Sequence, residues 1–285
     1  MSATTGGSRM LGVVALVSVV AASCGRAAAE TESSAQTPAD GALQSASLPI
    51  ASLADRVYLS EDEHIQVEMA IQRCMADKGF EYEFAPFFDG RIELERRYGV
   101  TDPQRALEVF AASDEPDAPT NPALDRLDQN ERDAWWDAFF GPEQVMIEID
   151  DGAGMIGRPA GGCLEVGWEV VVGDVDRWFK ADHEVQAFLR DSYLASMLDA
   201  RVQAAMHEWS ACMGSRGFNV ATFDDLDALR GSARDTEMIF ADASCNSESD
   251  LAAIWFAVES EIQDSLLPKV ETEIDELLTG TTLDR

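Results

Sequence analysis

Positive charge is scarce in this sequence. Lysine and arginine together number 21, against 53 aspartates and glutamates, so the formal net charge is -32. A surface with this charge repels nucleic-acid phosphates and anionic lipid head groups, which excludes both as direct ligands. It attracts basic peptides and divalent cations. It also keeps an exported protein in solution, which is the more general reason for such a composition.

Catalytic motifs are missing as well. No Ser-x-x-Lys is present, the three histidines form no His-Glu-x-x-His, and residues 213–217 lack the first glycine of the serine-hydrolase pattern. Residues 152–157 spell Gly-x-Gly-x-x-Gly, but Pro159 stands where the helix of a dinucleotide site would begin. Carboxylates are too numerous for any pair to be assigned to glycoside cleavage, and no acidic run follows an EF-hand loop. We therefore favour a non-enzymatic protein and expect no cofactor and no metal site.

Long apolar runs are absent, apart from one short run near the N-terminus. Residues 10–22 follow Arg9 and are too few to span a bilayer, but they are typical of an export signal. Residues 20–25, Val-Ala-Ala-Ser-Cys-Gly, resemble a bacterial lipobox with Ala21 in the place of the usual leucine. We predict that residues 1–23 are a lipoprotein signal peptide and that lipid on Cys24, palmitate included, anchors the protein to the outer face of the cytoplasmic membrane. Cleavage without lipidation is the alternative.

The segment that follows the signal has almost no bulky residues. Residues 24–50 are rich in Ala, Ser, Thr, Gln and Glu, a composition that predicts a flexible tether between the anchor and the folded part.

Cysteine is rare, and four cysteines remain after Cys24: Cys74, Cys163, Cys212 and Cys245. None belongs to a Cys-x-x-Cys pair. An even number of cysteines in an exported chain favours disulfides over metal thiolates or redox centres.

One heptapeptide occurs twice. Residues 74–80 read Cys-Met-Ala-Asp-Lys-Gly-Phe, and residues 212–218 read Cys-Met-Gly-Ser-Arg-Gly-Phe. A basic residue, a glycine and then an apolar residue that contacts the preceding turn are typical of a helix that ends in a left-handed glycine. The repeat predicts two related halves, 51–183 with a Cys74–Cys163 disulfide and 184–285 with a Cys212–Cys245 disulfide. A Cys74–Cys212 disulfide would instead join the two helix ends.

Apolar periodicity and capping residues predict a mainly α fold: one compact, disulfide-stapled helical domain of two pseudo-repeated halves with few short strands. We expect helices at 61–78, 91–98, 103–112 and 129–140, a long one from 184 or 192 to 216, and a last one from about 250 to 278 that Pro268 kinks or divides. A strand is expected at 145–149 and at best an edge strand at 81–88. Residues 150–162 read as a glycine-rich loop, and 163–179 fit a helix or a strand.

Four aromatic residues crowd one short predicted helix: Trp135, Trp136, Phe139 and Phe140. They cover more than one face of it, so they form a candidate binding surface. Core packing is the alternative, because aromatic side chains dominate burial in small cores.

The repeated helix ends, the Tyr-Gly-Val turn at 98–100, the Phe-Gly-Pro end of the Trp-rich helix at 140–142 and the Gly-Gly-Cys step at 161–163 resemble a group of uncharacterised exported lipoproteins of actinobacteria. The resemblance covers roughly residues 53–267. It implies an envelope-anchored helical domain with two disulfides, and it brings no catalytic residues.

These observations predict a non-enzymatic, membrane-tethered cell-envelope protein that presents an acidic helical surface to a protein or cell-wall partner. The first alternative is a cell-wall hydrolase or modifying enzyme that uses acidic residues, with the region of Trp135 and Trp136 as its substrate groove. The second is a solute-binding component of a transporter, which the missing strand–helix alternation disfavours.

Overall fold

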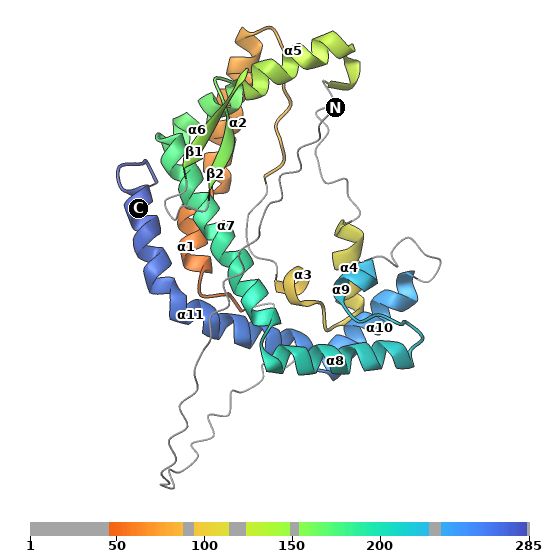
Figure 1. The fold of residues 1–285 in the computed structure, drawn as a ribbon. Helices are drawn as coiled ribbons and strands as arrows, with labels where there is room; N and C mark the ends of the chain where they lie inside the picture. Colours follow the sequence, from red (N-terminus) through yellow and green to blue (C-terminus); the bar gives the residue numbers. More distant parts are fainter. Residues whose placement is uncertain (1–45, 88–93, 114–123, 149–153, 228–234, 284–285) are drawn as a thin grey trace, which may run out of the picture. The chain divides into compact units, whose positions relative to one another are not determined.

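The computed structural model describes residues 46–87, 94–113, 124–148, 154–227 and 235–283. The predicted signal peptide, Cys24 and most of the predicted tether lie outside these residues. The described residues form one compact unit, mostly helical with a small two-stranded sheet and two disulfides (Figure 1). The predicted fold class is therefore confirmed.

In the described ranges the regular elements follow one another as helices, interrupted by a single β-hairpin (Figure 1). They are α1 Ala51–Val57, α2 Glu61–Asp77, α3 Leu94–Tyr98, α4 Pro103–Ser113, the 3-10 turn η2 Leu124–Arg126, α5 Gln129–Phe140, β1 Glu143–Glu148, β2 Met155–Ala160, α6 Cys163–Val172, α7 Val175–Met197, α8 Ala200–Ser215, α9 Phe223–Asp227, α10 Asp235–Glu248 and α11 Leu251–Leu278.

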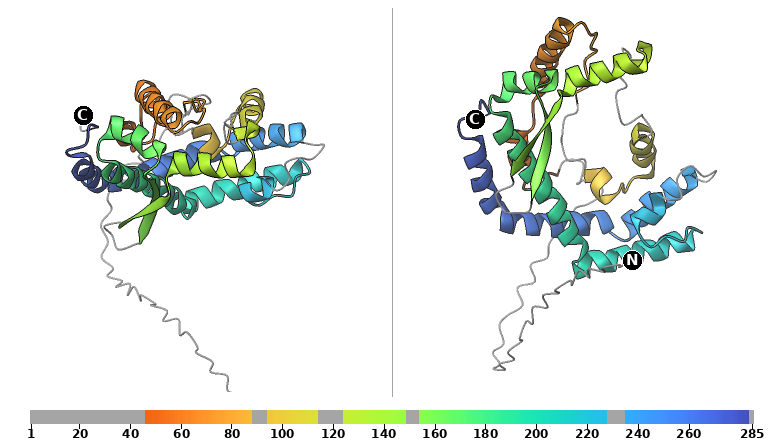
Figure 2. Two further views of the ribbon diagram at one scale, coloured as in Figure 1. Left: turned by 90° about the horizontal axis from the view of Figure 1, so that it is seen from above. Right: turned by 45° about the horizontal axis from the view of Figure 1, so that its top comes forward.

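Helix packing falls into three overlapping groups. The long helices α7 and α11 pack against each other, with α1 against α7 and with α3 and α8 against α11. Helices α2, α5 and α6 form a second group, and α10 packs against α4 and α8 in a third (Figure 2). One apolar core runs through the first two groups, extends to α10 in the third, and contains the buried indoles of Trp135, Trp209 and Trp255.

The two copies of the heptapeptide form the same helix ending. Gly79 and Gly217 have positive φ angles of 87° and 88°. The amide of Phe80 donates to the carbonyl of Met75 at 2.9 Å, and the amide of Phe218 donates to that of Met213 at 3.0 Å. Both methionine side chains are fully buried. This six-residue closure is the Schellman ending that the sequence predicts, and it occurs twice.

The structural likeness extends beyond the heptapeptide. In the first copy the side chain of Gln72 donates to the carbonyl of Tyr82 at 3.2 Å, and in the second Ser210 donates to the carbonyl of Val220 at 2.6 Å. In each pair the donor stands two residues before the cysteine and the acceptor three residues after the glycine. A polar side chain therefore ties the outgoing chain back to its own helix in both copies.

The disulfides are Cys74–Cys163, which joins the end of α2 to the start of α6, and Cys212–Cys245, which joins α8 to α10. This is the pairing that the duplicated motif favours. The boundary predicted after residue 183, however, lies inside α7. Because α1, α3 and α4 also pack against elements of the second half, the halves share one body.

The predicted tether extends too far. Residues 48–50 belong to the folded part, where Leu48 and Ile50 are at most 2% exposed and α1 begins at Ala51. The amide of Ile50 also donates to the side chain of Gln263 at 3.2 Å. Burial of these two large apolar side chains stabilises the folded state by more than the conformational entropy that the short segment loses when it is ordered.

The prediction of one long helix up to residue 216 is wrong, because the chain forms two helices there, α7 and α8. Asp199 leaves the helical conformation and its carboxylate accepts the amide of Arg201 at 2.8 Å, so a new helix begins there. Leu198, which fits the apolar period of one continuous helix, is 82% exposed in the connection.

Several further predictions differ from the structure in whole or in part. Residues 155–160 of the predicted loop form β2, which pairs antiparallel with β1 from Glu143↔Ala160 to Glu148↔Met155. Residues 81–87 form no strand. Helix α10 was not predicted, and α11 starts after Asp250, which has a left-handed backbone and no capping side-chain bond. Pro268 lies inside α11 without dividing it, although the ribbon of this helix bends (Figure 1).

Candidate functional site

Helix α5 carries the aromatic residues that the sequence singles out. Its start is fixed locally, since Asp128 accepts the amide of Glu131 at 3.0 Å while Glu131 accepts the amide of Asp128 at 2.9 Å. Its end is fixed by Gly141, with a φ of 85°, where a Cβ would lie 1.9 Å from the carbonyl oxygen of Ala160. The hairpin therefore lies directly against the end of α5.

Two of the four aromatic residues face the core. Trp135 is 2% exposed and donates its indole N–H to the carbonyl of Glu81 at 3.0 Å. Phe139 stacks on Trp135 with ring centroids 5.0 Å apart, and Tyr82 stacks on Phe139 at 5.7 Å. For these two residues the core-packing alternative is correct, and neither lines an open groove.

The other two aromatic residues face outward. Trp136 is 40% exposed and Phe140 is 38% exposed. Their rings lie 5.2 Å apart at an angle of 8°, so they stack on each other along the outside of α5. Asp133 and Asp137 are also exposed, and the spacing of one and two helical turns places them on the same side of the helix as the two rings. We call Asp133, Trp136, Asp137 and Phe140 the outer face of α5.

A buried ion pair occupies a second position of chemical interest. Glu259 is fully buried on α11, and Arg97 on α3 donates to its two oxygens at 3.0 and 2.5 Å. The hydroxyl of Tyr98 donates at 2.7 Å, that of Ser192 at 2.7 Å, and the amide of Gln263 at 2.9 Å. The carboxylate therefore accepts five hydrogen bonds, which occupies both of its oxygens.

The electrostatics of this cluster are those of a structural pair. Burial and then the charge of Glu259 raise the pKa of Tyr98 well above its ordinary value. Burial by itself would lower the pKa of Arg97, but the hydrogen bonds and charge of Glu259 raise it. The guanidinium also lies over the ring of Tyr193, 4.6 Å from its centroid. The raised pKa values keep the Tyr98 hydroxyl protonated and Arg97 charged at neutral pH. The hydrogen bonds of the cluster join α3, α7 and α11.

A second ion cluster attaches the hairpin to the helices. Arg158 on β2 is 6% exposed and contacts the carboxylates of Glu165 on α6 and Asp176 on α7, each at 2.5 Å. Glu165 also accepts the amide of Gly161 at 2.6 Å. This backbone hydrogen bond lowers the pKa of Glu165 most. Burial alone would raise that pKa, but the hydrogen bond and charge of Arg158 lower it further.

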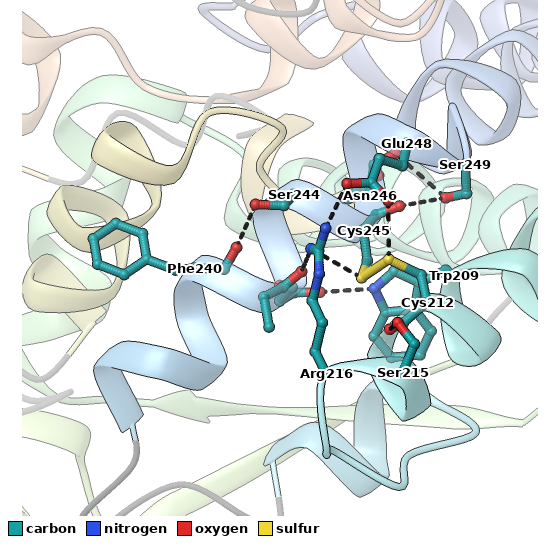
Figure 3. Close-up of a disulfide and its surroundings, with 12 residues drawn as sticks. Trp209, Cys212, Ser215, Arg216, Phe240, Ser244, Cys245, Asn246, Glu248 and Ser249 are labelled. Carbon is teal, nitrogen blue, oxygen red and sulfur yellow. Dashed lines mark hydrogen bonds and ion pairs between the residues drawn. A yellow bond between two sulfur atoms is a disulfide. The ribbon is translucent and has the colours of Figure 1, made fainter.

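The Cys212–Cys245 disulfide has a cation beside it (Figure 3). Arg216, the basic residue of the second heptapeptide, donates to the carbonyl of Ala241 at 3.0 Å and to the sulfur of Cys245 at 3.2 Å, and it forms an ion pair with Glu248. The basic residue of the heptapeptide thus bonds a carbonyl of α10 in this copy, rather than only facing the end of its own helix.

Within the described ranges, no group of three or more His, Cys, Asp or Glu side chains is arranged to hold a metal ion. No helix among the described residues is long and apolar enough to cross a membrane. The histidines are apart from one another: His64 contacts the carbonyl of Ala85 at 3.0 Å, while His183 lies on α7 and His207 on α8. In the acidic stretch at the start of α9, Asp225 accepts the amides of Ala221 and Thr222.

Comparison with known proteins gives no match: the chain matches no protein-family model, no curated protein and no solved structure. The assignment of function therefore rests on the residues themselves. Sequence reasoning missed Arg97 and Glu259. A signal was present, because Glu259 follows the buried Trp255 by one helical turn and so stands on the apolar stripe of α11.

Proposed function

We propose that this chain is a non-enzymatic, membrane-tethered cell-envelope protein whose helical domain binds a protein or cell-wall partner. In this proposal the lipid on Cys24 anchors the chain and the folded domain extends outward on the tether. The two disulfides are compatible with export, since such bonds persist in oxidising compartments. The resemblance to exported actinobacterial lipoproteins supports the same location.

The observation that carries the binding role is the outer face of α5. A stacked pair of large aromatic rings, each more than a third exposed, is unusual on a protein surface unless something covers it. The two buried ion clusters, those of Glu259 and Arg158, are engaged in contacts that join helices and the hairpin. Exposed aromatic area next to carboxylates is a surface suited to recognition of a partner.

The decisive experiment compares binding with cleavage. The full chain is incubated with purified cell-wall material, and both the retained protein and the released fragments are measured. In parallel, cross-linking in cells compares the native chain with a Trp136→Ala variant. We expect a cross-linked envelope partner that the variant loses, and no released fragments. Release of wall fragments would instead establish the hydrolase alternative, and equal cross-linking of both chains would remove α5 from the binding surface.

A further inference from the structure

The outer face of α5 combines two kinds of group in a regular order. Asp133, Trp136, Asp137 and Phe140 stand at positions one, four, five and eight of a helical stripe, so carboxylates alternate with aromatic rings along one side. The opposite side buries Trp135 and Ala138 against the body of the protein. The stripe is therefore held in place by a packed inner face.

The two carboxylates are not required to build the helix. The capping box at the start of α5 uses Asp128 and Glu131. Asp133 accepts a hydrogen bond from the exposed amide of Gln129 at 2.9 Å. The side chain of Arg132 donates to the carbonyl of Leu127 at the start of the helix. Asp133 and Asp137 thus add negative charge beside the rings without a capping role.

The chemistry of this stripe matches a cation on a flexible chain. A guanidinium or ammonium group is attracted to the face of an aromatic ring, and an arginine can stack on a ring while it bonds a neighbouring carboxylate. The charge of -32 on the whole chain draws a positively charged partner toward it from a distance. A neutral glycan gains nothing from that charge, and nucleic acid is repelled by it.

We propose that the outer face of α5 docks a basic polypeptide segment, rich in arginine or lysine, of an envelope partner. This inference rests on the proposed function and names the partner class of the same surface. The rings of Trp136 and Phe140 contact the cationic side chains and their aliphatic stems, while Asp133 and Asp137 accept their hydrogen bonds.

The test uses a short arginine–glycine repeat peptide and the purified full chain, with affinity measured by calorimetry. We expect the double variant Trp136→Ala, Phe140→Ala to weaken binding roughly tenfold, since two exposed cation–π contacts are lost. We expect Asp133→Asn with Asp137→Asn to weaken it about fivefold at low salt, in line with two exposed charge pairs. A glutamate–glycine repeat peptide should not bind.

Matched controls separate this site from general attraction to an acidic protein. Asp264→Asn with Glu271→Gln removes the same charge from exposed positions of α11, and Leu198→Ala removes an exposed apolar side chain between α7 and α8. Both controls should leave the affinity within twofold of the native value. Equal losses for the α5 variants and the controls would overturn the inference.

The failure of this inference can be told apart from the failure of the proposed function. If the peptide does not bind but Trp136→Ala still loses the partner cross-linked in cells, the binding role stands and the basic partner is wrong. Binding of soluble wall glycan fragments to the same residues would also leave the binding role in place and show that the basic partner is wrong. Release of wall fragments by the protein would overturn the proposed function itself.

Discussion

Replacing Glu259 by glutamine should destabilise this protein more than almost any other single change of a polar residue. The carboxylate is fully buried and accepts five hydrogen bonds, two of them from the guanidinium of Arg97, whose side chain is 18% exposed. Glutamine has nearly the same shape, but it is neutral, and its amide N–H groups would face groups that donate hydrogen bonds to the Glu259 carboxylate. Arg97 then keeps a largely buried charge without a counter-charge.

The expected loss follows from that imbalance. Removing one member of a buried ion pair costs about 3–5 kcal/mol, because the remaining charge is left unpaired in a poorly hydrated site. Unfolding in urea, followed by far-ultraviolet circular dichroism with both disulfides intact, measures the free energy of unfolding. A variant with both Arg97→Met and Glu259→Gln should lose clearly less than the sum of the two single variants, because the two residues interact directly.

A nearby exposed pair supplies the control. Glu261, two residues further along α11, pairs with Arg201 at 2.8 Å, but both side chains are about half exposed. Glu261→Gln should change the unfolding free energy by less than about 1 kcal/mol. If Glu259→Gln also cost less than about 1 kcal/mol, or if the Arg97 and Glu259 effects were additive, our account of the buried pair would be refuted.

Two other predictions concern α6 and its neighbours. Gly167→Ala should lower the free energy of unfolding in urea by about 1–3 kcal/mol, because its new Cβ would lie 2.6 Å from Cγ1 of Ile71 on α2. Gly214→Ala, which has open space around it in α8, should raise the free energy of unfolding by about 0.5–1 kcal/mol. Equal effects of the two variants would contradict this packing. The folded state lowers the pKa of Glu165, so the stability that this carboxylate contributes is complete above its ordinary pKa and is lost as the pH falls through the lower folded value. Glu165→Gln should therefore flatten the acid limb of a plot of stability against pH, while an unchanged acid limb would exclude this contribution.

The starts and ends of several helices were predictable, because they depend on residues only a few positions apart. The helices expected from residues 61 and 129 begin there, each behind a capping box, and the Schellman endings at Gly79 and Gly217 occur where the heptapeptide predicts them. The break between α7 and α8 also had a local signal in Asp199, but the apolar period concealed it by running through Leu198.

Pairing between distant segments was much harder to read. The strand β2 contains Gly157 and Pro159, both poor strand formers, and it forms because it pairs with β1 and because Arg158 binds Glu165 and Asp176. Likewise, the sequence shows four aromatic residues on α5 but not which of them are covered. That division depends on Tyr82, which arrives from another part of the chain and covers Phe139 while Trp136 remains outside.

The helical class, the ends of the motif helices and the preferred cysteine partners could be predicted, because each follows from the spacing of a few residues. The interlocking of the two halves, the contact of Glu259 with Arg97 across 162 residues and the exposure of one side of α5 emerge from the packing of the folded chain. These features were hidden because burial depends on the whole surroundings of a side chain. A charge or an aromatic ring becomes structural or available for binding only when the packing of distant segments covers it or leaves it exposed.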